Sequence, residues 1–208
     1  YLARPDNISR FTRGRFHPND VALVKAPPIS GPPDPTPRQI DARTDWNRTR
    51  RTALLLTEDD LSPGFLGLPV NGFEGFATLN SLHGQSPLGV SNMVAAFVNG
   101  AFSDTWGRIR SVAGRPIGHD LQTSSVDNLV DWARRTQIEQ LVTPYSPVGP
   151  AQGALDILER KLAPLGIDLV RVLRPSDAMA WPRATHGFFR FRQQIPSLIK
   201  QHNKDIGR

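Results

Sequence analysis

Three short loops of this 208-residue chain carry side chains that could bind a ligand, and each loop follows a short apolar run. The first is the acidic run Glu58, Asp59 and Asp60, the second is "TPYSPVGP" at residues 143–150, and the third spans residues 174–177. Carboxylates suit Mg²⁺ or the hydroxyl groups of a ribose, whereas hydroxyls beside a glycine suit a ligand that approaches the backbone. The residue types therefore indicate binding of a small polar molecule.

Parallel strands of an open sheet present their carboxyl ends along one edge, where ligands of such sheets bind. The free N–H groups of a helix that starts near Pro150 could also bind an anion, although Pro147 and Pro150 remove two of the donors. The alternative is a rigid corner, in which Tyr145 packs inward and the prolines only end the strand. On the ligand hypothesis, seven residues bind a cofactor: Thr57, Glu58, Thr143, Tyr145, Ser146, Gly149 and Arg174.

The sequence lacks the motifs of several catalytic classes. It has no cysteine, which excludes disulfides and thiolate metal sites, and its five histidines are scattered without HExxH spacing. No G-x-S-x-G, G-x-G-x-x-G or Walker loop occurs. We therefore predict neither a metal site nor a catalytic residue in this chain.

The pattern of apolar residues predicts alternating strands and helices. Short apolar runs at residues 53–56, 76–80, 139–146 and 167–173 are typical of strands. Between them, a helix starting after Ser91, a Ser-capped helix at 126–133 and a helix at 151–165 that ends at Gly166 show spacings of three and four. This order predicts an α/β fold with a mainly parallel, Rossmann-like sheet and helices on both faces.

Prolines divide the chain. The segment "PPISGPPDPTP" at residues 27–37 has six prolines in eleven positions, which favours an extended path. We predict that residues 1–18 are the tail of an upstream helical domain, that residues 19–50 form a Pro-rich linker, and that residues 51–208 form the α/β domain. The uncharged stretch 75–103 is interrupted by Gly, Pro, Asn and Ser, so no membrane span is predicted.

The formal net charge of +6 is concentrated at the two ends of the chain. In the closing stretch "WPRATHGFFRFRQQIPSLIK", aromatic residues alternate with basic ones. Such a mixture can stack on bases or on a flavin ring, or it can close the edge of the sheet and contact a partner domain. Four residues are predicted to lie at a nucleic-acid or domain interface: Arg183, His186, Arg190 and Arg192.

Several phrases resemble one family. "ISRFTRGRFHP" followed by a Pro-rich strap, "ALLLTEDDLSP", "VTPYSPVGP" and "WPRATHGFFRFRQQIPSLI" resemble the carboxyl-terminal half of bacterial photolyase-like FAD-binding proteins of the photolyase and cryptochrome superfamily. The resemblance implies a parent protein whose helical FAD-binding domain precedes this portion and contacts it. The flavin-binding residues of the family lie in that helical domain, so none has a counterpart here. Arg183 replaces the histidine of the family motif W-P-H-A-T.

The resemblance further implies light-dependent DNA repair or photoreception by a cytoplasmic parent that binds FAD. This chain alone is then expected to bind no FAD and to lack catalysis, while its α/β domain could hold an antenna chromophore or a nucleotide. The chain begins at Tyr1 without Met, which also favours a longer parent. The alternative hypothesis is a stand-alone α/β module that binds a nucleotide or nucleic acid through its basic ends.

Overall fold

A computed structural model describes residues 4–18, 31, 33, 40, 45–62, 72–113 and 119–206 of the chain. The chain divides into two compact units, Tyr1–Gln39 and Ile40–Arg208. In the first unit, helix α1 (Pro5–Phe11) starts with a proline and is followed by Gly14 at a φ of 74°. Most of the predicted linker at 19–50 lies outside the described residues.

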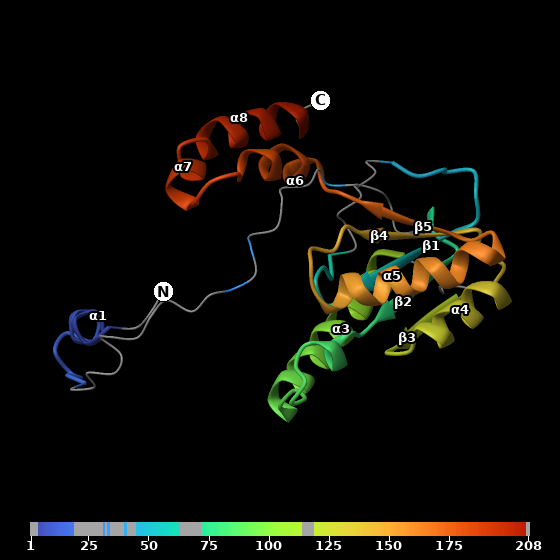
Figure 1. Cartoon of the computed structure of the whole chain (residues 1–208). Helices are drawn as coiled ribbons and strands as arrows, with labels where there is room; N and C mark the ends of the chain where they lie inside the picture. Colours follow the sequence, from blue (N-terminus) through green and yellow to red (C-terminus); the bar gives the residue numbers. More distant parts are fainter. Residues whose placement is uncertain are drawn as a thin grey trace. The chain divides into compact units, whose positions relative to one another are not determined.

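The second unit is built on five parallel strands, shown in Figure 1. They are β1 (Thr52–Thr57), β2 (Gly75–Leu79), β3 (His119–Thr123), β4 (Gln140–Pro144) and β5 (Asp168–Val172). Their order across the sheet is β3-β2-β1-β4-β5, and every adjacent pair is parallel. The predicted Rossmann-like α/β fold is confirmed.

Alternate residues of the central strands fill two cores on opposite faces of the sheet. On one face, Leu55, Leu141 and other buried residues pack against α4 (Val126–Arg135) and α5 (Pro150–Leu162). On the other face, Leu54 and Val142 pack with Trp106 and Ile109 of α3 (Asn92–Ala113). Because both faces are covered, the inner strands are apolar on both sides, as the short apolar runs predicted.

The helix ends follow the predicted caps. The Ser125 hydroxyl accepts a hydrogen bond from the Asn128 N–H, and the Ser91 hydroxyl accepts one from the Val94 N–H. After α5, the short 3₁₀ helix η4 (Ala163–Leu165) ends at Gly166, whose φ of 71° is the left-handed conformation that glycine favours. Local sequence signals therefore fix where these helices begin and end.

The part of α3 that meets the sheet differs from the prediction. The spacing of three and four predicts an apolar stripe that comprises Val94, Phe97, Val98, Ala101 and Phe102. Phe102 is buried, but Val94 and Phe97 are exposed, Phe97 by 75%. The buried residues of α3 lie from the middle of the helix onward: Phe102, Thr105, Trp106 and Ile109. The early part of the stripe was wrong because periodicity identifies an apolar face but not which turns of a long helix reach the sheet.

The chain ends in a group of short helices that the sequence did not predict. They are α6 (Pro175–Ala180), the 3₁₀ helix η5 (Trp181–Arg183), α7 (Phe188–Arg192) and α8 (Ile195–Ile206). Helix α6 contacts α8, whereas α7 buries none of its five residues. The aromatic residues Phe188 and Phe189 thus lie outside both cores of the sheet.

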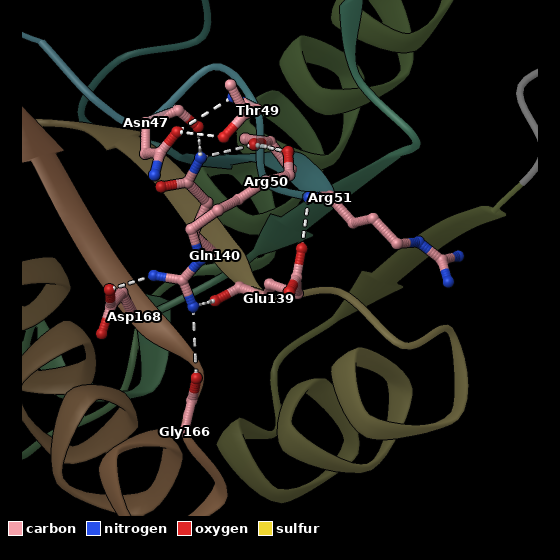
Figure 2. Close-up of polar contacts among 9 residues, drawn as sticks. Asn47, Thr49, Arg50, Arg51, Glu139, Gln140, Gly166 and Asp168 are labelled. Carbon is pink, nitrogen blue, oxygen red and sulfur yellow. Dashed lines mark hydrogen bonds and ion pairs between the residues drawn. The ribbon is translucent and has the colours of Figure 1, made fainter.

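Polar side chains tie together the amino ends of β1, β4 and β5, as Figure 2 shows. Arg50 donates to the carbonyl oxygens of Glu139 (2.7 Å) and Gly166 (3.3 Å) and pairs with Asp168. Gln140 donates from Nε2 to the Thr52 hydroxyl (2.6 Å) and to the Asn47 carbonyl. This amino-end network satisfies polar groups at the end of the sheet opposite the predicted ligand edge.

Replacing Gly75 by alanine is expected to destabilise the sheet unit by about 1 to 3 kcal/mol, because β2 and β3 approach too closely there for a side chain. A Cβ at this position would lie 2.8 Å from the His119 carbonyl oxygen and 3.1 Å from Cζ2 of Trp132. Urea unfolding followed by circular dichroism measures the change. The control is Gly153→Ala in α5, where a Cβ meets nothing within 4 Å, and we expect a gain of about 0.5 to 1 kcal/mol. Equal effects of the two substitutions would contradict the steric explanation.

Candidate ligand site at the carboxyl edge of the sheet

The strand order places a topological switch point between β1 and β4, since the chain moves from β1 to β2 on one side and later adds β4 on the other. In open parallel sheets this is the usual position of a ligand. Thr57 ends β1, and Thr143 lies near the end of β4. Both are buried, and their positions in the strands place them on the face covered by α4 and α5.

The acidic run after β1 connects three neighbouring loops. Glu58 accepts hydrogen bonds from the N–H (3.1 Å) and the hydroxyl of Ser81, which follows β2. Asp59 accepts one from the hydroxyl of Ser146, which follows β4. At the end of β5, Arg174 donates from Nε to Asp60 at 3.0 Å and forms an ion pair with it.

These bonds occupy the carboxylates that the sequence offered to Mg²⁺ or to a ribose. Each carboxylate of the run bonds the loop after a different strand, so together the three brace the carboxyl edge of the sheet. Within the described ranges, no group of three or more His, Asp or Glu side chains is arranged to hold a metal ion. The acidic run thus has a structural role that needs no ligand.

The residues of "TPYSPVGP" are directed to different neighbours. Thr143 is fully buried, and its hydroxyl has no hydrogen-bond partner among the described residues. The half-buried ring of Tyr145 packs edge-on against Trp181, with ring centroids 5.5 Å apart. Ser146 is buried against Asp59, and Gly149 is the N-cap residue of α5. This arrangement has the features of a corner, and cofactor binding by the seven predicted residues stays a prediction.

A second region of the same edge contains a pocket that the sequence did not predict. Its volume is about 300 Å³, and it lies where β2 and β3 end beside α3. Strands β2 and β3 and the residues after them contribute Thr78, Asn80, Gln122, Thr123 and Ser124, while α3 contributes Asn99, Phe102 and Ser103. The lining is therefore polar and uncharged, with one aromatic ring.

Some of the lining groups already have partners within the protein. Asn80 accepts from the Leu82 N–H (3.0 Å), Thr123 accepts from the Ser125 N–H (3.0 Å), and Ser103 donates to the Asn99 carbonyl (3.0 Å). Four other side chains form no hydrogen bond with a described residue: Thr78, Asn99, Gln122 and Ser124. Two hydroxyls and two amides can thus donate to or accept from a bound molecule.

Sequence reasoning missed this pocket because it missed β3. The strand reads "HDLQT", is mostly exposed and has no apolar run. One signal was present: "TLNS" and "LQTSS" both carry hydroxyls and amides where a strand ends. Recognising the second phrase as a strand end would have placed Thr78 and Gln122, which are paired in the sheet, on one edge.

The four predicted interface residues lie in the terminal helical segment. Arg183 ends η5, and Arg190 and Arg192 belong to α7. The exposed ring of His186 contacts the hydroxyl of Thr185 at 2.9 Å. All four side chains are exposed, so each is available to a partner.

Comparison of the chain with models of protein families, with curated proteins and with solved structures finds no match. The family resemblance therefore stays a prediction based on sequence phrases. Among the helices that the structure describes, none is both long and apolar enough to cross a membrane.

Proposed function

We propose that the sheet unit is the ligand-holding, non-catalytic α/β portion of a photolyase- or cryptochrome-like flavoprotein. Its ligand binds in the polar pocket beside β2, β3 and α3. The observation that carries the proposal is the pocket itself: an uncharged, hydroxyl- and amide-rich cavity at the carboxyl edge of a Rossmann-like sheet. In this proposal the parent binds FAD in its helical portion and acts in DNA repair or photoreception.

The lining indicates the class of ligand. With no charged side chain in the pocket, a phosphate would lose water without gaining a counter-charge. The exposed amides of Asn99 and Gln122 can pair with the amide edge of a heterocycle or with sugar hydroxyls, and Phe102 offers an apolar wall. We therefore propose an uncharged ring compound bearing hydroxyl or amide groups, which is the chemistry of a nucleoside or of an antenna chromophore without phosphate.

Riboflavin, FMN and FAD test this proposal because all three carry the same isoalloxazine ring, whereas riboflavin has no phosphate, FMN has one and FAD has two. Titration of the 208-residue chain, followed by flavin fluorescence, is expected to show saturable binding of riboflavin. FMN and FAD should bind at least about tenfold more weakly, corresponding to about 1.4 kcal/mol for the unpaired phosphate. A chain that binds FAD as tightly as riboflavin, or that binds no riboflavin, would contradict the proposal.

A pair of substitutions on α3 assigns the binding to this pocket. Ser103 lines the pocket, so Ser103→Trp should fill it and abolish riboflavin binding. Ala96 is also exposed on α3 but lies outside the lining, so Ala96→Trp should leave the affinity unchanged. If both variants bound riboflavin with the same affinity, the riboflavin site would not be this pocket.

A further inference from the structure

The short helix α7 exposes two adjacent aromatic rings. Phe188 is 63% exposed and Phe189 is 77% exposed, and no residue of α7 is buried. Burial of a phenylalanine side chain stabilises a protein because it removes apolar surface from water, and an exposed ring does not contribute this stabilisation. Two neighbouring rings that forgo this stabilisation mark a surface that can gain free energy by contacting a partner.

The segment that carries these rings is basic, and none of the carboxylates in the described part of the chain pairs with its arginines. Between Ala178 and Lys204 the sequence contains no Asp or Glu, whereas it contains Arg183, Arg190, Arg192 and Lys200. The guanidinium groups of the three arginines form no ion pair or hydrogen bond with a described residue, unlike Arg50 or Arg171 of the sheet. The surface is therefore complementary to an anion that also offers apolar or aromatic faces.

We propose that the exposed surface of α7, which comprises Phe188, Phe189, Arg190 and Arg192, binds single-stranded nucleic acid without sequence preference. Each nucleotide supplies a phosphate for an arginine and a base for an aromatic ring, and such pairs of contacts hold single strands in many proteins. The proposal does not depend on the function proposed for the pocket.

The geometry of the rings favours a single strand over a duplex. The rings of Phe188 and Phe189 have centroids 5.8 Å apart and an interplanar angle of 66°. The bases of a regular stack are parallel, so two rings inclined at this angle cannot both stack on bases of the same stack. Unstacked bases of a single strand can turn individually toward each ring, whereas the bases of a duplex are covered by their neighbours.

Fluorescence anisotropy with a labelled oligothymidylate tests the proposal on the full 208-residue chain. Binding should weaken with salt, with a slope of about −0.7 for each phosphate neutralised. The double substitution Phe188→Ala and Phe189→Ala should weaken binding at least about tenfold, because removal of each ring also removes the stacking contact with one base. The double substitution Arg190→Glu and Arg192→Glu should weaken binding and reduce the steepness of the salt dependence.

Two controls separate a defined site from general charge attraction. Arg134 and Arg135 are exposed on α4, which contains no phenylalanine, and their replacement by Glu makes the same change in net charge. These α4 variants should retain most of the affinity. Heparin, a polyanion without bases, should bind the phenylalanine variants as well as it binds the original chain.

Three results would overturn the proposal. One is the absence of oligothymidylate binding at low salt, and another is an equal loss from the α4 and α7 charge reversals. The third is a loss of heparin and oligothymidylate binding by equal factors in the phenylalanine variants, which would assign the surface to an acidic protein partner instead. Circular dichroism of every variant, with unchanged urea midpoints, confirms that binding is compared between folded chains.

Discussion

Trp106→Ala is expected to destabilise the sheet unit by about 3 to 5 kcal/mol, the range for large buried aromatic side chains. Trp106 is 2% exposed and packs with strand residues from β1, β2, β4 and β5 on one face of the sheet. It is the largest fully buried side chain among the described residues, and the guanidinium of Arg110 lies over its ring, 5.5 Å from the centroid. Urea unfolding by circular dichroism should show a large fall in the midpoint.

Trp106→Phe distinguishes packing from hydrogen bonding at this position. The indole Nε1 is buried and has no hydrogen-bond partner among the described residues. Phenylalanine keeps an aromatic ring and removes this unpaired donor, so its cost should be confined to the smaller volume, about 1 to 2 kcal/mol. If the phenylalanine variant were as unstable as the alanine variant, Nε1 would have to make an important hydrogen bond, contrary to this explanation.

The fold could be predicted where a strand is buried on both faces. Residues of β1, β4 and β5 form short apolar runs because helices cover the sheet on both sides. The edge strand β3 has no such signal. Its residues are mostly exposed, and it is defined by its backbone pairing with β2, which is a contact between segments far apart in the sequence.

At the candidate site, the sequence identified groups but not their partners. Glu58, Asp59 and Asp60 bond residues that lie 23, 87 and 114 positions away in the chain. From the sequence alone, three adjacent carboxylates after a strand favour a cation or a ribose. Once folding brings Ser81, Ser146 and Arg174 to them, the same carboxylates connect the loops of the sheet.

The pocket escaped prediction for a related reason. Its lining comes from β2, β3 and the middle of α3, whereas the predicted apolar stripe begins earlier on the helix, at Val94 and Phe97, and reaches this part only at Phe102. Correct placement requires knowing that Trp106 and Ile109, rather than Phe97, face the sheet. The position of α3 along the sheet thus determines that Asn99 and Ser103 lie beside the ends of β2 and β3.

The amino-end network gives the second large effect. Gln140→Ala is expected to destabilise the sheet unit by about 2 to 4 kcal/mol. The side chain of Gln140 is 1% exposed, and Nε2 donates to both the Asn47 carbonyl and the Thr52 hydroxyl. Alanine leaves a cavity and removes the buried hydrogen bond to the Thr52 hydroxyl, which is out of contact with solvent. Urea unfolding monitored by circular dichroism measures the change.

Gln137→Ala is the matched control, because it makes the same chemical change at an exposed position near the same end of the sheet. Gln137 accepts a hydrogen bond from Arg51 at 2.9 Å, but its side chain stays in contact with solvent. Water can replace that bond, so the cost should stay within about 0.5 kcal/mol. The difference between the two variants then measures burial of the amide. If Gln140→Ala cost no more than Gln137→Ala, the network in Figure 2 would not stabilise the junction of β1 with β4.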